Sequence, residues 1–274
     1  MSSFEATAYG SFMRIGVVGC GRVGTAICRA IDAGIVHADL AAVCDLEAAR
    51  VQRLVFGLKR PTRSMSLAGL VASVAMVIEA TNRHAAPQVM MAAINGGRDL
   101  LVTNPAAVFA RDDFPRLAHE RGLTIFAVNS LLAGASLFST PGSSSGTLLS
   151  LTLTCPPAVL ADAPFLRGRD LKAGSEPLLV FQGEAVDAMA AIPAVANLVA
   201  SAMLGAGDAE LLVRVRADPS SSATDIELLA NADQQQTAIR SCVPADGSDP
   251  VHPEIVGAAA AGVLRSLMSP LRLA

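Results

Sequence analysis

The stretch "RIGVVGCGRVG", residues 14–24, combines an apolar run, three glycines and the beginning of a helical pattern. Gly19, Gly21 and Gly24 have the spacing G-x-G-x-x-G and directly follow the apolar residues 15–18. In a strand–turn–helix unit the first glycine permits a tight turn, the second lets a phosphate approach the backbone, and the third lets the helix pack on the strand. The helix N-terminus then offers amide groups to the phosphate. The stretch predicts a dinucleotide-binding turn, with an ordinary strand-to-helix turn as the alternative.

An acidic residue follows at the distance that a dinucleotide site requires. A second strand is expected to end at Asp45, which comes 21 positions after Gly24. An acid there hydrogen-bonds the ribose hydroxyls of NAD and repels the additional phosphate of NADP. Arg50 and Arg53 lie near enough in the sequence to blur this preference. We therefore expect NAD as the cofactor, with NADP possible. The expected cofactor contacts here are Gly19, Gly21, Arg22, Val23, Gly24 and Asp45.

The first half of the chain alternates strand-like and helix-like patterns. Near-continuous apolar strands that alternate with helices indicate a parallel sheet covered on both faces. We expect an α/β fold, with a Rossmann-type doubly wound parallel sheet in a dinucleotide-binding domain over residues 1–130. The expected strands are 15–18, 40–44, 62–65, 74–78, 100–103 and 124–128, and the expected helices are 23–33, 47–56, 67–73, 84–95 and 112–121.

The pattern changes after Asn129, where the turn-rich "STPGSSSG", residues 139–146, leads into a region of strands. The segment "LLVRVRAD" alternates apolar and charged residues, as a sheet with one solvated face does. We expect a second, smaller α+β domain over 131–246, and a C-terminal helix within 247–274 that packs back on the first domain. The expected strands are 147–154, 178–181, 210–217, 225–230 and 237–243, with a helical region at 185–204 that is interrupted at Pro193.

The composition excludes several classes of protein. Hydrophobic residues make up 52% of the chain and charged residues 16%, which is typical of a core-rich globular protein. A net charge of −3, a single Tyr and no Trp disfavour nucleic-acid binding. The apolar runs are interrupted before the roughly 20 residues of a membrane-spanning helix. The five cysteines have no C-x-x-C spacing, which predicts reduced, buried thiols in the cytoplasm, and no spacing predicts a metal site.

Polar residues follow two of the predicted strands. Glu79, Thr81 and Asn82 come at the end of the fourth strand, and Asn104 follows the fifth. The carboxyl ends of parallel strands border the ligand crevice in such sheets, so we expect Thr81, Asn82 and Asn104 to contact the cofactor. His84 has two interpretations. It lies beside the nicotinamide, or it caps the following helix and faces water.

Several stretches resemble the L-aspartate dehydrogenase family. In the first domain they are "GVVGCGRVG", "AAVCDLE" and "FARDDFPRLAHERG". In the second they are "VFQGEAVDAMAAIPAVANLVASAML" and, near the end, "DPVHPEIVGAAAAGVLRSL". The resemblance covers most of the chain. It implies an NAD(P)-dependent enzyme that oxidises aspartate to iminoaspartate, and chains that pair through the sheet of the second domain. We therefore expect a homodimer.

Carried over residue by residue, the resemblance implies a substrate-holding role for Asn197, with an exposed asparagine on a helix surface as the alternative. The family's acid/base histidine is missing, and the alignment puts Asp225, or Thr224, at its position. Asp225 would need burial to act as a base near neutral pH. The expected catalytic residues are Asn197, Asp225 and His84.

Further departures concern the binding of substrate. The family's Gly-rich turn is replaced by "SLLAGAS", residues 130–136, and a basic residue before the paired prolines is replaced by Cys155. Arg214 and Arg216 either bind a carboxylate, for which an Arg fork is well suited, or line a solvated strand face. Sugar-type oxidoreductases carry a catalytic Lys where this chain has Asn104, so that chemistry is unsupported.

Two functions fit these observations. The favoured one is an NAD(P)-dependent oxidoreductase that transfers a hydride between nicotinamide and an amino or imino dicarboxylate or a related small acid. The alternative is a dinucleotide-binding homologue that has lost dehydrogenase turnover and serves as a sensor or assembly subunit.

Overall fold

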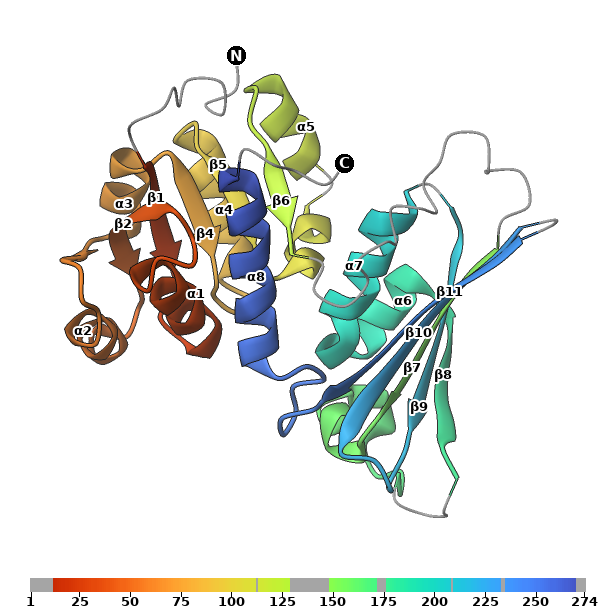
Figure 1. The fold of residues 1–274 in the computed structure, drawn as a ribbon. Helices are drawn as coiled ribbons and strands as arrows, with labels where there is room; N and C mark the ends of the chain where they lie inside the picture. The colour runs from red at the N-terminus through yellow and green to blue at the C-terminus, as the bar shows by residue number, and fades with distance from the viewer. Residues whose placement is uncertain are drawn as a thin grey trace. The chain divides into compact units, whose positions relative to one another are not determined.

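The computed structural model describes residues 12–111, 113–128, 148–171, 176–207, 209–232 and 235–269. The chain divides into two compact units. The first is formed by residues 1–128 with 254–274, and the second by residues 129–253. Each unit is built around its own sheet, as the ribbon in Figure 1 shows.

The first unit contains a six-stranded sheet with the order β3-β2-β1-β4-β5-β6, in which every pairing is parallel. The strand order reverses between β1 and β4, which is where a doubly wound sheet opens its ligand crevice. The predicted Rossmann-type sheet is therefore confirmed. The strands are β1 (Met13–Val18), β2 (Ala38–Cys44), β3 (Arg63–Ser64), β4 (Met76–Glu79), β5 (Asp99–Val102) and β6 (Ile125–Ala127).

Helices cover both faces of this sheet (Figure 1). Every residue of β4 and of β5 is buried, as expected for strands that are covered on both sides. One core cluster lies around Ile27 of the first helix, and the other lies around Leu70 and Ile94 on the opposite side. The helices are α1 (Arg22–Asp32), α2 (Ala48–Phe56), α3 (Leu67–Ser73), α4 (Ala86–Asn95), α5 (Phe114–Glu120) and α8 (Pro253–Met268), together with the 3₁₀ helix η2 (Pro105–Ala110).

The C-terminal helix α8 packs on α1. Its residues Ala260 and Leu264 belong to the same core cluster as Ile27. A Cβ atom added at Gly257 would lie 2.6 Å from the Cβ atom of Ala26, so the missing side chain permits the close approach of the two helices. Residues 270–274 lie outside the part of the chain that the structure describes.

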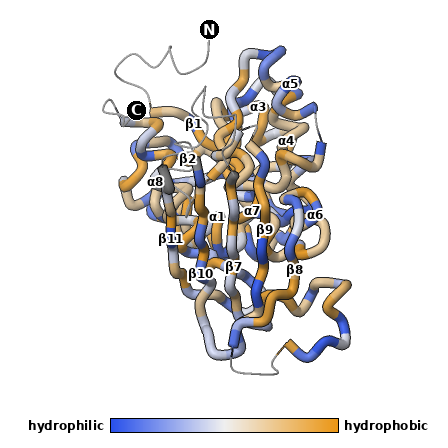
Figure 2. The backbone as a smooth tube through the Cα atoms, turned by 90° about the vertical axis from the view of Figure 1, so that its right-hand side faces the viewer, coloured by the Kyte–Doolittle hydropathy of each residue, from blue (hydrophilic) through white to orange (hydrophobic). Residues whose placement is uncertain are grey.

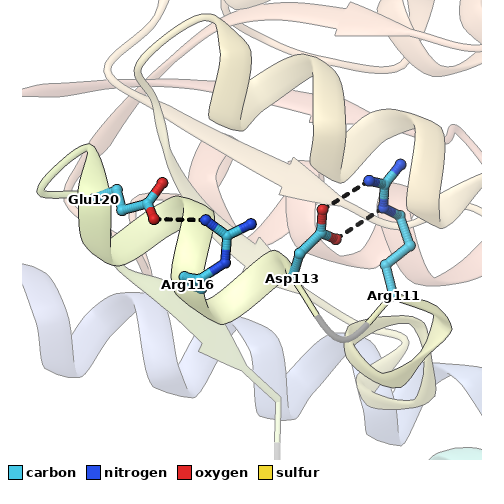
Figure 3. A network of polar contacts seen from close by, with 4 residues as sticks. All are labelled: Arg111, Asp113, Arg116 and Glu120. Carbon is cyan, nitrogen blue, oxygen red and sulfur yellow. Dashed lines mark hydrogen bonds and ion pairs between the residues drawn. The ribbon is translucent and has the colours of Figure 1, made fainter.

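Exposed ion pairs surround the start of α5 (Figure 3). Arg111 donates to both carboxylate oxygens of Asp113, at 2.9 and 2.7 Å, and holds the pKa of that carboxyl below its ordinary value. Arg116 pairs with Glu120 one turn further along the helix. Such solvated pairs contribute little to stability. The helix begins at Phe114 rather than at 112, the start that the sequence predicted.

The second unit contains a five-stranded mixed sheet with the order β11-β10-β7-β9-β8. In this sheet β7 and β9 are parallel, and the other neighbouring pairs are antiparallel. The predicted α+β domain is confirmed, and Pro193 begins a short 3₁₀ helix at the junction of α6 and α7, as expected. The elements are β7 (Leu148–Cys155), β8 (Leu178–Glu184), α6 (Ala185–Ala191), α7 (Ala196–Ala206), β9 (Leu211–Ala217), β10 (Ala223–Ala232) and β11 (Gln235–Pro244).

The two faces of this second sheet differ. Hydrophobic and hydrophilic positions alternate along its strands in Figure 2, and β9 shows why. Val213 and Val215 of β9 are fully buried on the face that α6 and α7 cover, whereas Arg214 and Arg216 lie on the other face. The period-2 alternation of the strand therefore corresponds to one covered and one uncovered face.

All five cysteines are free thiols. Cys20, Cys28 and Cys155 are buried, and burial raises the pKa of the Cys155 thiol to about 12. Cys44 is half-buried. The expectation of a buried thiol is wrong for Cys242, which is exposed because it lies on the uncovered face of the edge strand β11.

Candidate functional site

The three glycines of the β1–α1 turn have different reasons for lacking a side chain. Gly19 has φ +103°, and a Cβ atom there would overlap the carbonyl oxygen of Ala80. A Cβ atom at Gly24 would overlap the carbonyl oxygen of Gly19. Around Gly21, by contrast, a Cβ atom would meet nothing within 4 Å. Gly19 and Gly24 therefore shape the turn, and Gly21 leaves open space in front of the backbone.

The N-terminus of the helix that follows is suited to bind an anion. Helix α1 begins at Arg22, with Gly21 as its N-cap and no side-chain oxygen hydrogen-bonded at that position. Its first turn, which includes Val23, contains no acidic residue. The partial positive charge of the helix N-terminus is therefore not neutralised from within the helix. The open space at Gly21 and this helix end together fit a dinucleotide phosphate.

The carboxylate of Asp45 is held against the same turn. One of its oxygens accepts a 2.6 Å hydrogen bond from the backbone N–H of Cys20, and the other accepts from the N–H of Glu47 at 2.8 Å. Arg50 pairs with Glu47 at 2.9 Å, and Arg53 is exposed in the last turn of α2. Asp45, the acid expected to contact the ribose, thus lies beside the glycine turn. Arg50, which is nearer to Asp45 in the sequence than Arg53, forms an ion pair with Glu47.

A buried carboxyl group joins the ends of β4 and β5. Glu79 is fully buried and accepts hydrogen bonds from the N–H and the hydroxyl of Thr81, both at 2.7 Å. The side-chain amide of Asn104 donates to the two Glu79 oxygens at 3.0 and 3.1 Å and to the Thr81 carbonyl at 3.0 Å. Burial raises the pKa of Glu79, against the effect of these donors. Sequence reasoning placed Thr81 and Asn104 at this edge but assigned no role to Glu79.

Asn82 and His84 lie in the loop before α4. Asn82, and not His84, caps the turn that leads into this helix. The Asn82 side-chain oxygen accepts from the N–H groups of His84 and Ala85 at 3.0 and 3.1 Å, so Asn82 is the residue that caps the turn. His84 is exposed, and its Nε2 atom accepts from the Arg83 side chain at 3.2 Å.

The predicted catalytic residues of the second unit lie on different layers. Asn197 is half-buried in the first turn of α7. Asp225 is exposed on the uncovered face of the sheet, where its hydrogen bond raises the pKa of the Cys242 thiol. Thr224 points to the covered face and is fully buried, and among the described residues only its hydroxyl is a buried side-chain polar atom without a hydrogen-bond partner. The structure therefore does not bring Asp225 onto the side of the sheet where Asn197 lies.

The two arginines of β9 also lie on the uncovered face. Arg214 donates to the side-chain oxygen of Gln182 on β8 at 3.2 Å, and Arg216 is exposed. Their positions agree with the interpretation as a solvated strand face. The segment 130–136, where the sequence departs from the family's Gly-rich turn, lies outside the described residues.

The described residues contain neither a metal site nor a membrane span. No group of three or more His, Cys, Asp or Glu side chains there could hold a metal ion. No helix in those ranges has both the length and the apolar character needed to cross a membrane.

Two family models match successive parts of the chain. Residues 19–126 match the NAD-binding domain of homoserine dehydrogenase, and residues 142–267 match the C-terminal domain of aspartate dehydrogenase. The first match covers the glycine turn, Asp45 and the Glu79 network. The second covers Asn197 and the five-stranded sheet.

Whole-chain relatives and solved structures agree with these matches. L-aspartate dehydrogenase of Methanosarcina barkeri is 31% identical over 270 residues, which cover 95% of this chain and 99% of the relative. That of Methanocella arvoryzae is 28% identical, with 95% and 98% covered. The crystal structure of aspartate dehydrogenase from Thermotoga maritima has a TM-score of 0.66 at 14% identity, covering 96% of this chain and 99% of that one. Scyllo-inositol dehydrogenase of Lactobacillus casei, with bound NAD(H), has a TM-score of 0.58 at 12% identity, covering 94% and 88%, and shares the fold.

The relatives and the two family models converge on one class of protein. The chain has an NAD-binding domain, and it belongs to the L-aspartate dehydrogenase family of NAD(P)-dependent oxidoreductases.

Proposed function

We propose that this protein oxidises L-aspartate with NAD. A hydride leaves the α-carbon for the nicotinamide and the ammonium group loses a proton, so iminoaspartate, NADH and a proton are the products. Water then converts iminoaspartate to oxaloacetate and ammonia. The observation that carries the proposal is the Asp45 carboxylate, hydrogen-bonded to the N–H of Cys20 inside the glycine turn. The full-length likeness to L-aspartate dehydrogenases supports the choice of substrate.

The coenzyme preference follows from charge. Bound NAD supplies the hydride acceptor, and the chain's part is to hold it. Asp45 would accept hydrogen bonds from ribose hydroxyls and would repel a 2′-phosphate. Arg50, the nearer basic residue, is paired with Glu47 at 2.9 Å, which supports NAD over NADP.

At the substrate end we propose distinct roles for the three predicted catalytic residues. Asn197 supplies an amide donor to a substrate carboxylate. His84 takes up the ammonium proton, because its side chain is exposed and histidine is the side chain that most often serves as a general base. Asp225 is the weaker choice for that role, since it is exposed on the uncovered face of the sheet, away from the face that carries Asn197.

We further propose a homodimer formed through the uncovered face of the second unit's sheet. This face carries basic residues, including Arg214 and Arg216, as well as the acidic Asp225 and Glu227. A face with both signs of charge can meet a copy of itself across a two-fold axis with opposite charges opposed. Light scattering coupled to gel filtration would test this: Arg216→Glu should shift the mass towards the monomer, and an unchanged dimer mass would argue for another interface.

The proposed activity is tested by following NADH formation from L-aspartate and NAD, and NADH consumption with oxaloacetate and ammonium. D-Aspartate and L-malate are the matched controls, because each keeps both carboxylates and changes either the configuration or the amine. Turnover with L-aspartate, but not with D-aspartate or L-malate, supports the proposal. Tight NADH binding with no turnover for any amino-acid and oxo-acid pair would instead favour a homologue that only binds the coenzyme.

A further inference from the structure

Glu79 is a charged side chain in an unusual place. It ends β4, is fully buried, and receives neutral donors only, from Thr81 and Asn104. In the described part of the chain it forms no ion pair. A buried carboxylate without a cation is unfavourable, and an apolar side chain in its place would often be more stable. Its presence is therefore better explained by the geometry that its hydrogen bonds impose.

The segment that Glu79 orders touches the glycine turn. The N–H of Ala80 donates to the carbonyl of Val18 at 2.8 Å. The carbonyl oxygen of Ala80 is the atom nearest to a Cβ atom placed at Gly19, and the two would overlap. The residues held by Glu79 are thus in direct contact with the turn that receives the coenzyme phosphates, at the point where the strand order reverses.

The direction of the hydrogen bonds allows one arrangement of this network. The Asn104 amide nitrogen faces three acceptors, which are the two Glu79 oxygens and the Thr81 carbonyl. Turning the amide over would place its oxygen against all three. The loops after β4 and β5 are therefore joined in a fixed register through one carboxylate.

We propose that Glu79 is a positioning residue for the nicotinamide end of the coenzyme, acting through Asn104 and Thr81 to hold the loops after β4 and β5 where the ring is received. The inference rests on the proposed coenzyme site. It predicts a defect confined to one end of the ligand, because the adenosine end is held by Asp45 on the other side of the glycine turn.

The test compares two ligands on the same variant. NADH carries the nicotinamide, and ADP-ribose lacks it but keeps the adenosine and both phosphates. In Glu79→Gln the new amide group faces the Asn104 amide nitrogen, so two donors meet. Isothermal titration of the purified full-length protein should show NADH binding weakened by about tenfold, the effect of losing one or two net hydrogen bonds, with ADP-ribose binding within about twofold of wild type.

Asp99→Asn is the matched control. Asp99 is also a buried carboxyl, on the neighbouring strand β5, but it lies at the opposite end of the sheet and accepts from the N–H of Thr124 at 2.9 Å. This variant should leave both affinities unchanged. Asn104 is half-buried, and Asn104→Ala should weaken NADH binding as Glu79→Gln does. It serves as the second variant if Glu79→Gln does not fold. The double variant should bind NADH no more weakly than either single one.

Equal weakening of NADH and ADP-ribose in Glu79→Gln would overturn the positioning role and leave a general structural one. Unchanged NADH affinity in both Glu79→Gln and Asn104→Ala would overturn it as well, while the proposed dehydrogenase function would stand. If the wild-type protein bound neither NADH nor ADP-ribose, the coenzyme site itself would be wrong and both proposals would fall.

Discussion

The carboxylate of Asp45 accepts a 2.6 Å hydrogen bond from the backbone N–H of Cys20, so the end of β2 is tied to the middle of the glycine turn. A second backbone donor, the N–H of Glu47, holds the other carboxylate oxygen at 2.8 Å. Because two amides fix its position, the proposed contact with a ribose would not require the side chain to be ordered first. The geometry of the turn and the proposed preference for NAD therefore depend on the same residue.

Replacing Asp45 should change the coenzyme preference. In Asp45→Ala the negative charge that opposes a 2′-phosphate is gone, and the ratio of NADPH to NADH affinity should rise by about 10- to 100-fold, which corresponds to about 1.4–2.7 kcal/mol. Titration with both reduced coenzymes measures this. Asp39→Ala, which removes an exposed acid from β2, the strand that Asp45 directly follows, is the control and should leave the ratio unchanged. An unaltered ratio in Asp45→Ala would contradict the assigned role.

Replacing two glycines of the same turn by alanine should affect different properties, coenzyme affinity in one variant and stability in the other. Gly21→Ala should fold with wild-type stability, since its Cβ atom meets nothing within 4 Å, but it should lose most coenzyme affinity because the methyl group occupies the ligand's space. Gly19→Ala combines φ +103° with an overlap with a carbonyl oxygen, and should be destabilised by about 1–3 kcal/mol or more. Thermal unfolding and NADH titration separate the two outcomes. Equal destabilisation of both variants would be inconsistent with this division.

The stability of the protein should depend on pH through Glu79. Burial raises its folded-state pKa above the ordinary value of 4.5. The folded state therefore binds the proton more tightly than the unfolded state, and the free energy of unfolding falls as pH rises from about 4.5 through the raised pKa. Relative to Glu79→Gln, which does not titrate there, the wild-type protein should lose stability across that window. Denaturant unfolding at a series of pH values gives the difference, and a rising difference would contradict the sign.

The buried hydroxyl of Thr224 should cost stability. It is fully buried without a hydrogen-bond partner, so Thr224→Val removes an unsatisfied polar atom at nearly constant shape. The midpoint of denaturant unfolding should rise by an amount equivalent to about 1 kcal/mol, with an unchanged m-value. Ser241→Ala on the neighbouring strand is the comparison and should not raise the midpoint. A destabilised Thr224→Val with lower activity would indicate that the hydroxyl has a partner in the working enzyme.

The kcat values of two variants should distinguish His84 from Asp225 as the acid/base. His84→Gln should lower kcat by about 100-fold, the usual effect of removing a general base, with little change in stability because the side chain is exposed. Asp225→Asn should retain kcat within about threefold, a change small beside the usual loss of a general base. Steady-state kinetics with L-aspartate measures both. The reverse order of effects would transfer the role to Asp225.

The local signals of the sequence determined the first unit. The glycine spacing, an acid 21 positions after Gly24 and near-continuous apolar strands predict strand, turn, helix and parallel sheet, because each depends on neighbours in the chain or on a simple period. The start of α4 at Ala86 shows the limit of such signals. The sequence extended this helix to His84, but the Asn82 side chain caps the preceding turn instead.

The tertiary structure decided which residues far apart in the sequence come into contact. Glu79 and Asn104 are 25 positions apart, and only the parallel pairing of β4 with β5 brings their side chains into contact. Likewise, the alignment left Thr224 and Asp225 as alternatives, and the pleat of β10 separates them onto opposite faces. A strand's period reports which residues share a face, but only packing decides which face is covered. The sequence by itself therefore determined the coenzyme fold, and the tertiary structure decided which distant side chains meet and which face of a strand is covered.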